Sequence, residues 1–252
     1  EAWNGFVLFP FQVRAIHFLK SNIFEPGKTF KFQLRVLSAD ETTIVSNIDL
    51  LGENNEFLVS MQGWEDRNFN LSKPLHRFFL QAIENTISSP LDILEERSAK
   101  QGKFSFSIIE GFPEDFFQRH HKIWEKMIAF LIFSESERQR WHSIAGNEES
   151  RIQYLLGRVA AKDALKLYLK KYCGLKLGPP DIIIENDKEG RPFASGSWVD
   201  KIDKVPMVSI SHKKMAVVAA AGIGARAGIG IDVEDISNMS DAVSAEVFSE
   251  AE

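Results

Sequence analysis

The segment RIQYLLGRVAAKDALKLYLKKY, residues 151–172, carries the clearest helical pattern of the chain. Its apolar residues recur at helical spacing and predict a helix that packs on a core along a broad stripe. The stripe consists of Leu155, Leu156, Val159, Ala160, Ala164, Leu165, Leu167 and Tyr168. Gly174 is the expected stop, because glycine readily adopts the left-handed conformation that ends many helices.

Helix and strand patterns alternate around this segment. An apolar helical pattern over residues 124–133 precedes a capping box in which Glu137 follows Ser134 by three positions. Strand patterns are predicted at residues 104–109, 181–185, 205–210, 217–223 and 229–233, with a turn at 186–191. Helices and strands mixed in this order predict an α/β or α+β domain.

The first 82 residues show strand patterns alone. Residues 30–36 alternate apolar and polar side chains, and two further strands at 43–51 and 57–64 flank a turn, which predicts a hairpin. Gly63 marks a bulge or bend in the second of them. A polar connector over residues 83–103 separates this part from the next. We predict an overall α+β chain with one domain at 1–95 and another at 96–252.

The composition limits the class of protein. Of the 252 residues, 44% are hydrophobic and 26% charged, as in ordinary globular proteins. The net charge of −5 gives no basic surface for nucleic acid, and no apolar run approaches the roughly 18 residues of a membrane span. The single Cys173 excludes an intrachain disulfide and a cysteine-rich zinc site. We expect a cytoplasmic protein that binds neither nucleic acid nor membrane.

Two short stretches near the end of the chain carry chemistry: VSISH at 208–212 and GIGIDVE at 228–234. Ser211 and His212 offer hydrogen-bond donors for a phosphate. Asp232 and Glu234 stand two apart on a predicted strand, so both leave one face and suit Mg²⁺. Each stretch alone also fits a capping serine, a surface histidine or solvated carboxylates. Together they predict a site for a magnesium-bound pyrophosphate.

Two basic elements could add to such a site. Arg191 lies in the turn EGRPF at 189–193, and its planar guanidinium can bond two phosphate oxygens. Arg158 and Lys162 are four apart on the predicted helix and therefore share one face. In isolation, an exposed turn arginine and a solvated basic stripe are the commoner interpretations. Gly228 and Gly230 lack the third glycine and the helix of a dinucleotide-binding motif.

Taken in order, LLGRVAAK (155–162), EGRP (189–192), ISH (210–212) and GIDVE (230–234) resemble successive motifs of 4′-phosphopantetheinyl transferases of the surfactin type. The resemblance covers about residues 104–252 and implies the first α/β half of that fold. It also implies Mg²⁺-dependent transfer of the phosphopantetheine arm of coenzyme A to a serine of an acyl carrier protein. Coenzyme A and a carrier protein or carrier domain are thus the implied substrates.

The resemblance also implies roles for individual residues. Asp232 and Glu234 would hold Mg²⁺ on the pyrophosphate, and Arg191, Ser211 and His212 would contact phosphates, chiefly at the 3′-phosphate and adenine end. Arg158 would add to this pocket, and His212 is the candidate catalytic residue. The family carries a later W-x-x-K-E-like motif with a third metal ligand. Residues 248–252 resemble its lead-in, so this motif is expected beyond the chain.

The first part resembles, less specifically, the end of a hot-dog fold from polyketide synthase dehydratase domains. The stretches IDLLG at 48–52 and MQGWED at 61–66 carry this resemblance. It implies a parent polyketide synthase with a fused transferase, and a chain cut from it at both ends. Two alternatives stay open: a catalytically inactive structural or docking remnant, and a dehydratase or thioesterase function of the first part.

Overall fold

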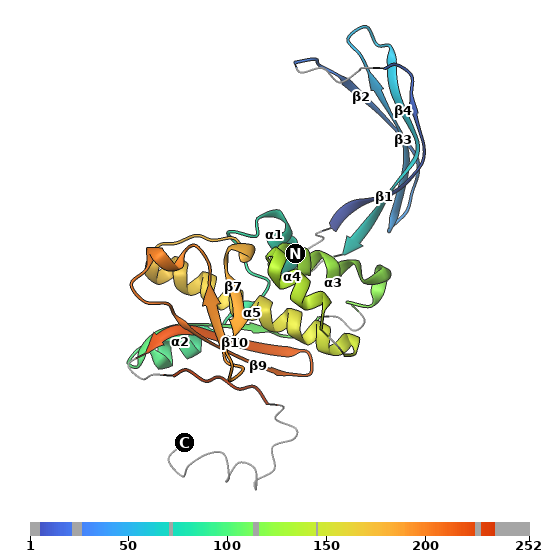
Figure 1. Cartoon of the computed structure of the whole chain (residues 1–252). Helices are drawn as coiled ribbons and strands as arrows, with labels where there is room; N and C mark the ends of the chain where they lie inside the picture. The colour runs from blue at the N-terminus through green and yellow to red at the C-terminus, as the bar shows by residue number, and fades with distance from the viewer. Residues whose placement is uncertain are drawn as a thin grey trace. The chain divides into compact units, whose positions relative to one another are not determined.

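The computed structural model describes residues 6–21, 27–70, 73–112, 116–144, 146–224 and 228–234, without the side chains of 6–7, 68–70 and 119–121. The expected motif lead-in at 248–252 lies outside these residues. Contacts cluster into two compact units, Glu1–His76 and Arg77–Glu252, which run from blue to cyan and from cyan to red in Figure 1. The boundary expected at residue 95 stays a prediction.

The first unit is an antiparallel sheet of long strands. Its order is β1 (Phe6–Phe18), β4 (Phe57–Asn70), β3 (Thr43–Leu51) and β2 (Lys31–Ala39). β3 and β4 pair as the predicted hairpin. Their register shifts beside Gly63, whose φ is +60° and whose N–H donates to the Asn47 side chain at 3.0 Å. The predicted bulge is therefore confirmed.

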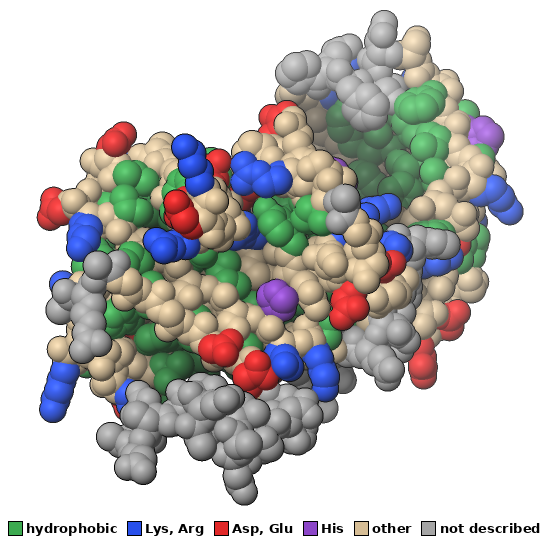
Figure 2. Space-filling model, turned by 60° about the horizontal axis from the view of Figure 1, so that its bottom comes forward, with side chains coloured by type: hydrophobic (Ala, Val, Ile, Leu, Met, Phe, Trp, Pro, Cys, Tyr) green, Lys and Arg blue, Asp and Glu red, His purple; other side chains and the backbone are tan. Residues whose placement is uncertain are grey.

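One face of this sheet forms an apolar hollow of about 540 Å³. Leu50 and Val59 are buried at its base, while Phe18 and Phe32 on the neighbouring strands remain exposed. Figure 2 shows hydrophobic side chains gathered in this hollow, at the upper right. The alternating pattern of the sequence thus places apolar side chains on one face of the sheet, as its period of two requires.

The second unit is built on a second antiparallel sheet. Its order is β5 (Ser89–Pro90), β6 (Gly102–Ile109), β10 (Ala216–Gly224) and β9 (Met207–Lys213). A separate hairpin pairs β7 (Ile183–Asn186) with β8 (Pro192–Ser195). The helix α1 (Lys73–Leu80) contains the boundary between the two units. The other helices are α2 (Asp92–Ser98), α3 (Arg119–Ile132), α4 (Glu135–His142) and α5 (Glu148–Cys173), with 3₁₀ turns at Pro179–Asp181 and Val199–Lys201. None of the described helices is long and apolar enough to span a membrane.

Helix α5 is the centre of this unit and crosses the face of the sheet (Figure 1). Asn147 caps its first turn by accepting from the Ser150 N–H at 2.9 Å, and Gly174 ends it with φ +68°. Small side chains such as Ala160 let the helix lie close to the sheet, where the Ser107 hydroxyl donates to the Ala160 carbonyl at 2.8 Å. The predicted long helix and its stop are confirmed, and burial extends well beyond one stripe.

Several strand predictions are wrong in detail. The first 82 residues include the helix α1, and the strand predicted at 205–210 spans Met207–Lys213. Residues 229–233 are not a strand: the N–H groups of Ile231 and Val233 donate to the hydroxyls of Ser209 and Ser211, at 3.2 and 3.3 Å, so no backbone ladder forms. The strand predicted at 181–185 begins only at Ile183, because a 3₁₀ turn with two prolines precedes it. The capping box of Ser134 and Glu137 is present as predicted.

Candidate functional site

Ser211 and His212 lie near the end of β9, on opposite sides of the strand. The Ser211 hydroxyl donates to Asp232 Oδ1 at 2.5 Å and accepts from the Val233 N–H at 3.3 Å. Together with Ser209, it holds the segment 228–234 along the outer edge of the sheet. Its hydroxyl therefore has protein partners already, and its predicted contact with a phosphate stays a prediction.

Asp232 and Glu234 are both exposed on this segment. The Ser211 hydroxyl, and next the Val233 N–H, lower the pKa of Asp232 below its ordinary value, so the group is ionised at neutral pH. Glu234 Oε2 pairs with Lys213 Nζ at 2.9 Å. The two carboxylates thus differ in environment: one is held by neutral donors and the other by a cation.

The donor set suits a hard divalent cation but does not complete its coordination. Within the described ranges, no group of three or more His, Cys, Asp and Glu side chains gathers as a metal cluster. Two carboxylates are nevertheless what Mg²⁺ commonly takes from a protein, because phosphate oxygens and water fill its other positions. The strand expected to place Asp232 and Glu234 on one face is absent, so a magnesium site at these two residues stays a prediction.

His212 and Arg158 line one cavity of about 370 Å³. Arg158 is only 6% exposed. Its Nη2 donates to Asn186 Oδ1 at 2.6 Å, and its guanidinium carbon lies 4.7 Å from the centre of the Tyr154 ring. Arg158 Nε and the Tyr154 hydroxyl are buried with no hydrogen-bond partner among the described residues. A buried guanidinium with an unused donor is a natural anion-binding group.

Arg191 lines a separate cavity of about 810 Å³, which also contains Ser209 and Gly228. The turn that carries it is built by Asp187, whose Oδ1 accepts from the N–H groups of Glu189 and Arg191 at 3.0 and 2.8 Å. Gly190 supplies the left-handed residue of the turn, with φ +83°. Pro192 lies between the two cavities and lines both. Arg158 and His212 therefore line the same cavity, while Arg191 lines the neighbouring one.

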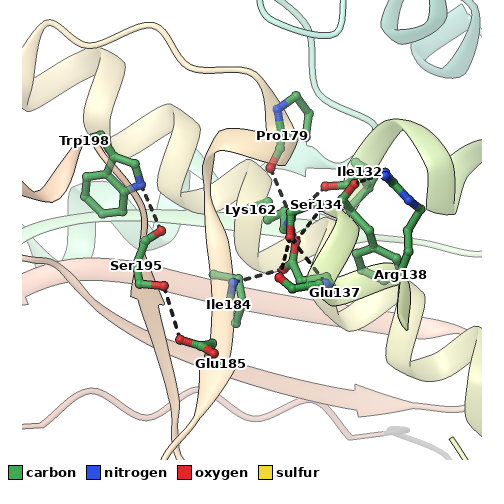
Figure 3. Close-up of polar contacts among 12 residues, drawn as sticks. Ile132, Ser134, Glu137, Arg138, Lys162, Pro179, Ile184, Glu185, Ser195 and Trp198 are labelled. Carbon is green, nitrogen blue, oxygen red and sulfur yellow. Dashed lines mark hydrogen bonds and ion pairs between the residues drawn. The ribbon is translucent and has the colours of Figure 1, made fainter. Parts of the chain in front are cut away.

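Lys162 takes no part in either cavity, and the interpretation of Arg158 and Lys162 as a solvated stripe is wrong. Lys162 is fully buried and donates to Glu137 Oε2 and the Ile132 carbonyl at 2.7 Å, and to the Pro179 carbonyl at 3.1 Å. Figure 3 shows these partners converging on its ammonium group. Burial lowers the pKa of Lys162 to about 8, with the Glu137 carboxylate opposing the shift.

Sequence reasoning missed Tyr154 and Asn186. Tyr154 precedes Arg158 by one helical turn, so the spacing of the helix could have indicated their contact. Asn186 directly precedes the turn of Arg191, where an asparagine is commonly assigned to the turn itself. Only the fold shows that its side chain reaches Arg158 on another element.

No protein-family model matches the chain. A holo-[acyl-carrier-protein] synthase of Anoxybacillus flavithermus (strain DSM 21510 / WK1) is 28% identical over 116 residues, which are 44% of this chain and 92% of the relative.

Solved structures of the same kind of protein match about half of the chain. One is a holo-(acyl-carrier-protein) synthase from Bacillus anthracis str. Ames in complex with CoA (3′,5′-ADP), with 26% identity, coverage of 50% of this chain and 96% of that chain, and a TM-score of 0.37. Another is the holo-ACP-synthase from Plasmodium yoelii, with 26% identity, coverage of 50% and 95%, and a TM-score of 0.36.

The similarity in sequence supports an enzyme of the transferase class. More specifically, the holo-[acyl-carrier-protein] synthase homologue supports a 4′-phosphopantetheinyl transferase, and the enzyme class predicted from the motifs is confirmed.

Proposed function

We propose that the second unit binds coenzyme A and takes part in the Mg²⁺-dependent transfer of its 4′-phosphopantetheine arm to a serine of an acyl carrier protein. One observation carries the proposal: His212 and the buried Arg158, from two distant parts of the sequence, line one cavity, and Asp232 accepts a hydrogen bond from Ser211 on the other side of the strand that carries His212. A cavity lined by a guanidinium, with carboxylates across one strand from it, suits a polyanion that brings its own metal ion.

Each residue of the site has a role that follows from its chemistry. Arg158 and His212 contact phosphate oxygens from the first cavity, and Arg191 contacts the same ligand from the second. Asp232 and Glu234 hold Mg²⁺, which neutralises negative charge on the pyrophosphate. In the transfer, the carrier serine oxygen forms a new bond to phosphorus, the bond to 3′,5′-ADP breaks, and the serine proton leaves to a base. Such reactions depend mainly on positioning and charge neutralisation.

Mass spectrometry tests the transfer directly. An apo acyl carrier protein is incubated with coenzyme A, Mg²⁺ and the natural polypeptide that contains residues 1–252. We expect the carrier to gain about 340 Da, the mass of the arm that this phosphoryl-type transfer adds. No gain with several carriers and a folded enzyme would contradict the proposal and favour a structural or docking role.

Titration calorimetry tests the phosphate contacts of this chain separately. We expect His212→Ala to weaken coenzyme A binding about tenfold or more, because a hydrogen bond to a charged group contributes about 1.5–3 kcal/mol. His17→Ala, at an exposed histidine of the first unit, is the control. Equal affinity in the two variants would contradict the role of His212.

We also propose that the first unit belongs to a dehydratase-like hot-dog domain, within a polyketide synthase. Its long antiparallel strands and apolar hollow support this, since an acyl chain needs such a surface. Hydration of an unsaturated acyl thioester by the natural polypeptide tests the alternative that this domain is an active dehydratase. Its absence in a polypeptide that still modifies the carrier would contradict a dehydratase activity and leave the transferase intact.

A further inference from the structure

Arg158 is restrained from two sides within its cavity. The Asn186 amide oxygen accepts from Nη2 at 2.6 Å, and the Tyr154 ring covers the guanidinium at 4.7 Å. Rotation about the Cζ–Nε bond would break the first contact. The guanidinium is therefore preorganised, and its buried Nε remains as a donor without a partner among the described residues.

Asn186 has a second hydrogen bond on the other side of its amide group. Its Nδ2 donates to the Gly190 carbonyl at 3.1 Å, within the turn that presents Arg191. The chemistry of the two partners fixes the orientation of the amide, because a guanidinium only donates and a carbonyl only accepts. One side chain thus connects the cation of the first cavity with the turn of the second.

We propose that Asn186 is a positioning residue, which holds the Arg158 guanidinium and the Arg191 turn in one fixed arrangement toward the phosphates of coenzyme A. The proposal rests on the proposed function of this site. A side chain that fixes two cations on separate elements lowers the ordering cost of binding a ligand that spans both cavities. Asn186 also lines the first cavity, so a double variant with Arg158 is needed to separate a direct contact with the ligand from action through Arg158.

Nuclear magnetic resonance of the ligand-free chain tests the restraint on Arg158 without reference to function. We expect slow rotation of the Arg158 guanidinium about Cζ–Nε in the wild type and at least severalfold faster rotation in Asn186→Ala. Asn186→Asp should restore slow rotation, because a carboxylate also accepts from Nη2. Lys188→Ala, at an exposed residue of the same turn, is the control. Equal rotation rates in wild type and Asn186→Ala would overturn the proposal.

Binding measurements test the consequence for the ligand. Coenzyme A and dephospho-coenzyme A, which lacks the 3′-phosphate, are titrated into wild type, Asn186→Ala, Arg158→Lys and the double variant. We expect Asn186→Ala to lose about tenfold in affinity for coenzyme A, as for one lost charged contact, and much less for dephospho-coenzyme A. In the double variant, the two losses should not add, because Asn186 acts through Arg158.

The outcomes separate the two proposals. A wild type that binds neither compound would overturn the proposed function, and with it the ligand role of Asn186. A wild type that binds coenzyme A, with Asn186→Ala equal to the Lys188→Ala control, would overturn only the positioning role. Fully additive losses would also overturn it, since they would mean that Asn186 acts independently of Arg158. Thermal melting of each variant identifies a misfolded one. If Asn186→Ala is misfolded, Asn186→Leu, which likewise offers no acceptor to Arg158 Nη2, replaces it in the rotation test.

Discussion

At the scale of single residues, Asp232 combines exposure with a fixed environment. Its carboxylate accepts from the Ser211 hydroxyl, its pKa is lowered, and it is placed at the edge of β9. Because this carboxylate is exposed, its charge loses little solvation free energy when the chain folds. It also remains accessible to a cation. Asp232 can therefore be replaced with little damage to the core.

We predict that Asp232→Ala in the natural polypeptide abolishes carrier modification and leaves the fold intact, because it removes a proposed metal ligand. Carrier mass gain is measured across a range of Mg²⁺ concentrations, and circular dichroism checks the fold. Asp203→Ala, at an exposed residue shortly before β9, is the control and should retain activity. Transfer by Asp232→Ala at the wild-type rate would contradict the metal site.

Asp163, in contrast to the exposed Asp232, is a carboxylate buried inside the second unit. Its Oδ2 accepts from the N–H groups of Ile87 and Ser88 and from the Ser88 hydroxyl, each at 2.9 Å, and Oδ1 is unpaired among the described residues. Burial raises its pKa from 3.8 to about 6, although Lys166 and these hydrogen bonds oppose the shift. At a pH between these two pKa values, Asp163 is therefore protonated in the folded chain and ionised in the unfolded chain.

We predict that Asp163 makes the free energy of unfolding fall as the pH rises from about 4 to about 6, by up to about 3 kcal/mol. The sign follows because the native state binds more protons than the unfolded state in this window. Urea unfolding of wild type and Asp163→Asn across pH 4–7 measures it, with Asp203→Asn as the control. The difference between wild type and Asp163→Asn should change with pH, and a constant difference would contradict the prediction.

At the scale of elements, the buried pair Lys162–Glu137 connects α5 to its neighbours. Glu137 also accepts from the Ser134 N–H at 2.9 Å and the Ile184 N–H at 3.1 Å, so one carboxylate joins α4, α5 and β7. Figure 3 shows this arrangement. Since Asn186 ends β7, the pair also fixes the hairpin that carries the candidate site.

We predict that Lys162→Met lowers the free energy of unfolding by about 3–5 kcal/mol, because removing one partner leaves a buried charge without compensation. Lys170→Met is the matched control on the same helix. Lys170 pairs with Glu84 at 3.2 Å but is half exposed, so its loss should cost at most about 1 kcal/mol. Urea unfolding at pH 7 compares them, and equal losses would contradict a special role for the buried pair.

At the scale of the whole molecule, every proposed coenzyme A contact lies within Arg77–Glu252. We predict that coenzyme A slows amide hydrogen exchange in α5, β9 and the 187–191 turn, and leaves β1–β4 unchanged. Ligand binding protects the elements that hold the ligand, because it lowers the population of their open forms. Hydrogen-exchange mass spectrometry with and without coenzyme A measures this protection. Dephospho-coenzyme A, which lacks the 3′-phosphate, is the comparison ligand. Protection confined to β1–β4 would contradict the site.

The sequence by itself determined the local elements and the enzyme class. The stripe and Gly174 predicted α5, the spacing of Ser134 and Glu137 predicted a cap, and Gly63 predicted a bulge. These features depend on nearby residues, whose spacing is visible in the chain. The ordered motifs indicated a 4′-phosphopantetheinyl transferase, which the homologue supports.

Only the tertiary structure decided how the polar residues divide their roles. Arg158 and Lys162 share one face of the helix by their spacing, yet one lines a cavity and the other is paired inside the core. The link from Asn186 to Arg158, and the serine hydroxyls that replace a ladder at 231–233, join residues distant in sequence. Such contacts arise from packing of whole elements, which no local pattern encodes, because burial decides whether a charge meets solvent, a ligand or a partner.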